Sequence, residues 1–158
     1  TGNIFNDQEQ ATFQTWMEEG GAFCGTHSAT DTEATWAFYS EITGQNFDGH
    51  GLQNQQGSIQ FEADALTHPA VAGLPNPWPR SEEWYNFNSH QVWGAKPGFK
   101  ILGRKDGVPM TWVREWSNFR SFYTGLGHDR SVFEGDANVE KHITGGILWA
   151  VRREHWLQ

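Results

Sequence analysis

Apolar and polar positions change period several times along the chain, and each change predicts the end of one element and the start of the next. Asn6 and Glu9 have the spacing of a capping box, and the apolar positions that follow predict a helix over residues 6–19. The pair Gly20–Gly21 ends this helix, and a short apolar strand over 22–26 comes directly after it. A helix and a strand joined by so short a connection predict a mostly parallel sheet with helices packed on its faces.

The middle of the chain adds a second helix and most of the strands. A short helix over 36–43 ends at Gly44, and the proline-rich stretch 69–79 predicts an irregular surface loop. Asp106–Gly107 is a hairpin signal between two strand-like segments. The strands predicted beyond residue 50 span 58–62, 99–103, 110–116 and 120–124.

The last element predicted is an amphipathic helix over 138–153. Val139, Ile143 and Ile147 recur at helical spacing, and Gly145–Gly146 permits close approach of this helix to the sheet. Three tryptophans lie on the apolar faces of their elements and are therefore expected in the core: Trp16, Trp112 and Trp149.

Composition indicates one soluble, globular domain over residues 1–158. Aromatic residues make up 15% of the chain and charged residues only 19%, which is typical of a folded chain with a substantial core. The net charge of −8 disfavours a nucleic-acid partner, because phosphate binding needs clustered Lys and Arg. Cys24 is the only cysteine, which excludes an intrachain disulfide. The longest apolar run, 147–151, is too short to span a membrane, so we expect no membrane partner.

His27 stands at the tip of a sharp turn between the strand over 22–26 and a new polar segment. Small residues flank it, from Gly25 to Ala29, which is the layout of a nucleophile elbow with histidine in the nucleophile position. Such a turn directs its central side chain over the carboxyl edge of a sheet, where α/β proteins bind their ligands. His27 is therefore a candidate catalytic residue, although a histidine in a polar turn is often only a hydrogen-bonding loop residue. Ser28 lies beside the tip, which disfavours a serine hydrolase.

A second histidine follows another strand end, in the glycine-rich segment Gly125–His128. The dinucleotide-binding pattern is incomplete here, because Arg130 occupies the place of its third glycine. Because strand ends can meet at one crevice in an open α/β sheet, we expect His27 and His128 to face each other.

Acidic and aromatic residues adjoin the proline-rich stretch. Adjacent residues of an extended segment point to opposite sides, so at most one of Glu82 and Glu83 faces the crevice, and Glu83 is the candidate acid or base. A merely charged loop is an equally good interpretation. The predicted substrate-binding residues are Asp31, Trp36, Trp84 and Tyr85.

His50, in a polar turn, adds a third candidate histidine. Together His27, His50 and His128 form a predicted ligand set for a divalent, zinc-like metal ion. With Glu83, Asp31 or Asp48 the same histidines would form a metal or an acid/base set. No compact metal signature supports this set. The other histidines stand outside any motif: His68, His90, His142 and His155.

Six segments spread over the chain resemble the trehalose-utilisation, ThuA-like family, which belongs to the class I glutamine amidotransferase-like superfamily. They are GAFCGTHSATDTE, THPAVAGLP, EEWYNF, TWVREW, SFYTGLGH and HITGGILWA. The resemblance implies a flavodoxin-like three-layer sandwich. Amidotransferase relatives carry cysteine at the elbow tip, where this chain has His27, so glutaminase chemistry is not expected.

Family members normally have a first β-α-β portion before the point at which this chain begins. The resemblance therefore implies a domain that lacks its N-terminal part and a strand over 22–26 that is open at one edge. Another copy of the chain, a second polypeptide or a rearranged segment is expected to cover this apolar edge.

The resemblance also implies a function in carbohydrate metabolism. The first hypothesis is metal-assisted acid/base cleavage of a glycoside, such as a 3-keto derivative of trehalose, by His27, His128 and Glu83. The second is a carbohydrate-binding domain without catalysis, and the third is an inactive remnant. Bacterial cytoplasm and periplasm or secretion are all compatible with the sequence.

Overall fold

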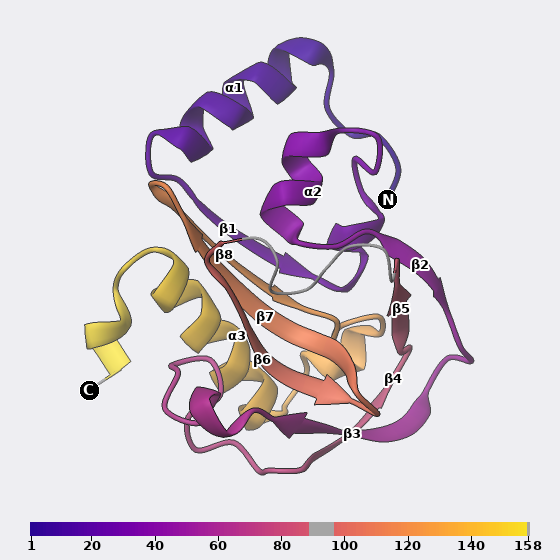
Figure 1. Ribbon diagram of the computed structural model, residues 1–158. Coiled ribbons are helices and arrows are strands. Elements are labelled where there is room, and N and C mark those ends of the chain that lie inside the picture. The colour runs from indigo at the N-terminus through magenta and orange to yellow at the C-terminus, as the bar shows by residue number, and fades with distance from the viewer. Residues whose placement is uncertain (89–96, 158) are drawn as a thin grey trace.

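The computed structural model describes residues 1–88 and 97–157, so His90 lies outside the described residues. Six strands form one sheet in the order β1-β8-β7-β6-β3-β4, and β2 and β5 form a separate antiparallel pair (Figure 1). The helices are α1 (Asp7–Glu18), α2 (Ala37–Thr43) and α3 (Ala137–Ala150). The strands are β1 (Ala22–Thr26), β2 (Phe47–His50), β3 (Gln55–Phe61), β4 (Trp78–Glu82), β5 (Tyr85–Phe87), β6 (Phe99–Lys105), β7 (Val108–Trp116) and β8 (Phe119–Thr124).

The prediction of a mostly parallel, flavodoxin-like sheet is wrong. Among the described strands of the six-stranded sheet, β1 and β8 form the one parallel pair, and the other neighbours are antiparallel. The reason lies in the connections: two-residue turns join β6 to β7 and β7 to β8, whereas a parallel connection needs a crossover of about a dozen residues or more. The Asp106–Gly107 hairpin signal was therefore the better guide to topology than the helix and strand at the start of the chain.

The parallel pair lies at the edge of the sheet. β1 pairs with β8 in the register Ala22 to Arg120 and Thr26 to Thr124. Within residues 1–88 and 97–157, no other strand pairs with β1, and the covering of its second edge stays a prediction.

The predicted helices and most strands are confirmed within a few residues. Asn6 and Glu9 form the expected capping box of α1, and Gly44 ends α2 in a left-handed conformation with φ of 86°. The proline-rich stretch differs at its end, where β4 begins at Trp78 and includes Pro79. Because β4 is an edge strand, the missing N–H of Pro79 is tolerated.

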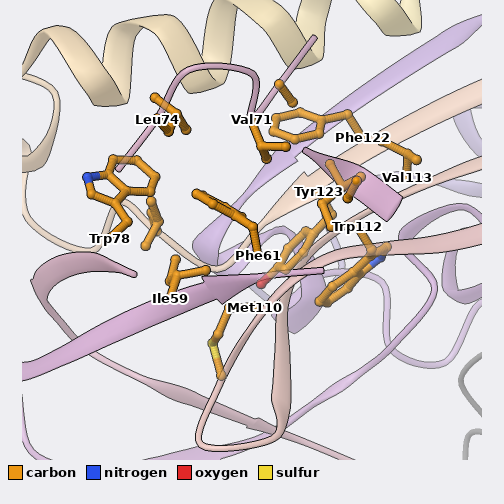
Figure 2. Packing of buried hydrophobic residues seen from close by; sticks show 14 of the residues in the cluster. Ile59, Phe61, Val71, Leu74, Trp78, Met110, Trp112, Val113, Phe122 and Tyr123 are labelled. Atoms are coloured by element: carbon orange, nitrogen blue, oxygen red, sulfur yellow. The ribbon is translucent and has the colours of Figure 1, made fainter. Parts of the chain in front are cut away.

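Helix α3 packs on one side of the sheet, and α1 and α2 lie on the other (Figure 1). A Cβ atom on Gly146 would come within 2.3 Å of the Phe122 ring, and one on Gly145 within 2.2 Å of the Pro69 carbonyl oxygen. The two glycines therefore permit the close packing that the sequence predicts. Figure 2 shows Val71, Leu74 and Phe122 among the side chains between this helix and the strands.

On the opposite face, Trp112 and Tyr123 stack with ring centroids 4.2 Å apart. The Trp112 indole donates to the Thr43 carbonyl oxygen at 2.9 Å, which ties the C-terminal end of α2 to β7. Trp112 is buried as predicted. Trp149 is partly buried against the core, but Trp16 is 49% exposed, so its assignment to the core is wrong.

His142 is a fully buried residue of α3. Its Nδ1 donates to the Ala70 carbonyl oxygen at 2.7 Å, and its Nε2 lies 3.1 Å from the Thr124 hydroxyl. Burial lowers the pKa of His142 to about 4, and the positive charge of Arg80 acts in the same direction. The side chain therefore packs as a neutral imidazole at neutral pH.

Among the described residues, no helix combines the length and apolar character needed to cross a bilayer.

We predict that Gly146→Ala lowers the free energy of unfolding by about 1–3 kcal/mol, because the added methyl group forces α3 away from Phe122. Thr144→Ala, at an exposed position of the same helix, is the control and should change stability by less than about 0.5 kcal/mol. Urea titration measures both values. Equal effects would show that α3 does not depend on close packing at Gly146.

We predict that His142 makes stability fall as the pH drops from 6.5 towards 4. The unfolded chain takes up a proton near pH 6.5, whereas the folded chain resists protonation until about pH 4, so acid favours unfolding. The loss attributable to this group is about 3 kcal/mol, given about 1.4 kcal/mol for each pKa unit. Urea titrations at pH 7 and pH 4.5 should show a smaller pH dependence for His142→Gln than for the unsubstituted protein. The same pH dependence in both would contradict the prediction.

Candidate functional site

The candidate site lies where the parallel strands β1 and β8 end. His27 follows β1 directly and opens a short 3-10 helix over His27–Asp31. Its backbone has φ of 43°, a left-handed conformation that is uncommon for a residue other than glycine. A sharp turn with strain at its tip agrees with the elbow predicted from the small flanking residues.

His27 is 5% exposed, so its side chain is buried although it stands at the tip of the turn. Its Nδ1 lies 3.2 Å from the Gly125 carbonyl oxygen, and because a carbonyl only accepts, Nδ1 carries the proton. Burial lowers the pKa of His27, and its contacts with Gly125 and Glu83 offset this only in part. A neutral His27 with its proton on Nδ1 presents an unprotonated Nε2 to the site.

Three electron-pair donors meet at this point. His27 Nε2 lies 3.1 Å from Glu83 Oε2 and 3.2 Å from His128 Nδ1, and the last two atoms lie 3.1 Å apart. The predicted convergence of His27 and His128 is therefore confirmed. Glu83 is the acidic residue that joins them, and its side chain is 4% exposed.

These contacts provide too few N–H donors for the two acceptors, His27 Nε2 and the Glu83 carboxylate. His128 Nδ1 supplies at most one N–H, so it serves only one of these two acceptors. Two lone pairs then face each other at 3.1 Å unless a cation or a shared proton lies between them. The arrangement fits a divalent cation, since tetrahedral nitrogen and oxygen ligands at about 2.1 Å lie about 3.4 Å from one another. His27, Glu83 and His128 are the residues that could hold it.

His50 lies at the edge of the site and is not one of the three converging ligands. Its Nδ1 is 2.8 Å from the Gly51 carbonyl oxygen and 3.3 Å from Glu83 Oε1. The carbonyl contact places the proton on Nδ1, so the other ring nitrogen of neutral His50 is a free base. The side chains of His50 and His128 are 40% and 33% exposed, so both lie between solvent and the buried pair His27–Glu83.

Tyr85 is the predicted substrate-binding residue that lies in the site. Its ring centroid is 4.0 Å from that of His27. Burial raises the pKa of the Tyr85 hydroxyl, and the charges of Glu83 and Asp31 raise it further. Tyr85 therefore stays protonated, and Asp31 is close enough to influence it electrostatically.

Trp36 and Trp84 lie in other surroundings. Trp36 packs with Phe5 and Phe13 at 6.3 and 6.0 Å. Trp84 is 5% exposed in the core, and its indole donates to the Gln55 carbonyl oxygen at 2.8 Å. Among the described residues, neither indole has a ring contact with a histidine of the site.

Sequence reasoning missed the groups that orient His27. The Tyr123 hydroxyl donates to the His27 carbonyl oxygen at 2.8 Å and lies 3.1 Å from the Thr30 hydroxyl. Gly125 contributes only its carbonyl, which no side-chain pattern can reveal. The one available signal was the position of Tyr123 and Gly125 at the end of a buried strand.

Comparison with known proteins identifies a family. A family model described as trehalose utilisation, ThuA, matches residues 1–150. No curated protein sequence matches the chain.

Two solved structures described as ThuA-like share the fold. The protein from Bacteroides uniformis superposes with a TM-score of 0.76 at 20% identity, over 96% of this chain and 66% of that one. The protein from Parabacteroides merdae gives 0.74 at 17% identity, over 95% and 67%. The chain thus spans about two thirds of their length. A β-galactosidase from Bacillus circulans matches with a TM-score of 0.60 at 12% identity, over 98% of this chain and 21% of that one.

We predict that His27→Ala lowers the free energy of unfolding by about 2 kcal/mol, because it leaves the Gly125 carbonyl without its partner and removes packing against Tyr85. His155→Ala, at an exposed histidine, is the control and should cost less than about 0.5 kcal/mol. Thermal and urea unfolding measure both. Similar small losses would mean that His27 contributes little to folding.

Proposed function

The chain belongs to the trehalose-utilisation (ThuA) family, and we propose that it processes a carbohydrate at the site formed by His27, Glu83 and His128. The observation that carries the proposal is the meeting of two imidazole nitrogens, of His27 and His128, and a carboxylate oxygen of Glu83 at 3.1–3.2 Å. Two histidines and one glutamate, with a further position open to substrate, are the ligand set of several catalytic zinc sites.

The proposed substrate is a glycoside oxidised to a ketone, such as a 3-keto derivative of trehalose. A ketone acidifies the adjacent C–H bond, so removal of that proton prepares cleavage of the glycosidic bond. A divalent cation, when bound, polarises the carbonyl group and stabilises the negative charge that develops on its oxygen. His27, Glu83 and His128 hold this cation in the proposal, and Tyr85 supports His27 from the side.

His50 is the proposed proton carrier. Its Nδ1 proton is held by Gly51, so its other nitrogen is free to accept a proton from substrate. Its side chain is 40% exposed, and its Nδ1 lies 3.3 Å from Glu83 Oε1, so the imidazole lies beside both the solvent and the buried ligands. This role replaces the predicted one of metal ligand, because the described geometry leaves His50 outside the three converging atoms.

We predict that the two roles separate in variants. Glu83→Gln should weaken binding of Zn²⁺ at least 100-fold and abolish turnover of a 3-keto-glycoside, because it removes the charged ligand shared by both histidines. His50→Gln should keep Zn²⁺ affinity within about threefold and lower kcat at least 100-fold, as expected for loss of a proton carrier.

Calorimetry with Zn²⁺ and a turnover assay give these values, and His155→Gln, at an exposed histidine, should leave both unchanged. Zn²⁺ binding and sugar binding without turnover would favour the alternative, a carbohydrate-binding domain. Failure to bind Zn²⁺ at all would overturn the cation site.

A further inference from the structure

The turn that carries His128 is attached to β4 through one buried carboxylate. The Gly127 N–H donates to Glu82 Oε2 at 3.3 Å, and Glu82 is 1% exposed. Gly127 directly precedes His128, so this contact fixes the backbone at the base of the His128 side chain. Gly127 has φ of 110°, and a Cβ atom there would come within 2.5 Å of the Phe133 ring, so the turn requires glycine at this position.

Glu82 is itself held in one orientation. Arg80 donates to Glu82 Oε1 from Nε at 3.2 Å and from Nη2 at 3.1 Å, and its Nη1 donates to Asp136 Oδ2. Asp136 in turn caps α3 by accepting from the N–H groups of Asn138 and Val139. The second oxygen of Glu82 is thus left for Gly127, with its direction set by a rigid guanidinium group.

The neighbouring residues Glu82 and Glu83 reach the same turn in different ways. Glu83 Oε2 contacts the His128 ring at 3.1 Å, whereas Glu82 Oε2 contacts the backbone of the preceding residue. One short segment of chain therefore supplies both a partner for the His128 side chain and a restraint on its position.

We propose that Glu82 is a positioning residue that sets the location of His128 Nδ1 and so the affinity of the site for a divalent cation. This inference rests on the proposed function, in which His128 is a ligand. Groups that orient metal ligands typically contribute 10–100-fold to metal affinity. Within residues 1–88 and 97–157, no hydrogen bond joins Glu82 to a ligand side chain, so its positioning effect passes through the Gly127 N–H.

The test measures Co²⁺ binding by its visible absorption, which also reports coordination geometry. Glu82→Leu should bind Co²⁺ 10–100-fold more weakly than the unsubstituted protein. Asp136→Ala is the matched control, because it removes a negative charge from the same arginine and weakens the α3 cap but leaves the contact between Glu82 and Gly127. Its Co²⁺ affinity should stay within about threefold.

Glu82→Gln replaces Glu82→Leu if that variant does not fold. Its amide has one acceptor oxygen, which cannot serve both Arg80 and the Gly127 N–H, so this variant should also bind Co²⁺ more weakly than the unsubstituted protein. Unchanged Co²⁺ affinity in Glu82→Gln would overturn the inference. Unchanged affinity in Glu82→Leu, or an equal loss in Asp136→Ala, would overturn it as well.

A measurement made without metal distinguishes failure of the inference about Glu82 from failure of the proposed cation site. If the unsubstituted protein binds no Co²⁺, the proposed cation site fails, and the imidazole ¹⁵N shifts of His128 then test Glu82 alone. A change of these shifts in Glu82→Leu but not in Asp136→Ala supports positioning. Identical shifts in all three proteins overturn it.

Discussion

The parallel pairing of β1 with β8 is the constraint on which the site depends. Thr26 and Thr124 are paired at the carboxyl ends of the two strands, and the turns that follow carry His27 and His128. Residues about a hundred positions apart thereby bring their ring nitrogens to 3.2 Å. In an antiparallel pair the two turns would leave opposite ends of the strands, so this single parallel pair in a mostly antiparallel sheet is what makes a shared site possible.

The burial of the Glu83 carboxylate at this site is electrostatically unfavourable for the fold. A carboxylate at 4% exposure is unfavourable unless positive or hydrogen-donating groups surround it, and His27, His50 and His128 all lie within 3.3 Å of its oxygens. Neutral His27 donates its one ring N–H to the Gly125 carbonyl oxygen and has none left for Glu83. The three imidazoles therefore do not provide enough hydrogen-bond donors for the carboxylate. A buried carboxylate in these surroundings favours a functional role for Glu83, because an apolar side chain would pack at this position equally well.

The aromatic residues show how much of an apparent sugar-binding composition belongs to packing. Trp84 and Trp112 are almost fully buried, and each uses its indole N–H on a backbone carbonyl. Trp36 takes part in the aromatic contacts that join α1 to α2. In the part of the chain that the structure describes, Tyr85 is the one predicted substrate-binding aromatic residue whose ring contacts a histidine of the site. The aromatic residues of the sequence therefore belong more to the packed core than to a ligand-binding surface.

Local sequence by itself determined the elements and the candidate histidines: the capping box of α1, the Gly44 end of α2, the β6–β7 hairpin and the two strand ends at His27 and His128 depend on neighbouring residues. The mostly parallel sheet predicted from the first helix and strand and from the family resemblance was wrong. Apart from the β6–β7 hairpin, strand order and direction came only with the tertiary structure, because pairing partners are set by packing across the whole sheet. The same holds for the contacts that give the site its chemistry. The Gly125 carbonyl fixes the tautomer of His27, and Glu82 restrains the turn before His128; both act between segments far apart in the chain, where no local pattern records them.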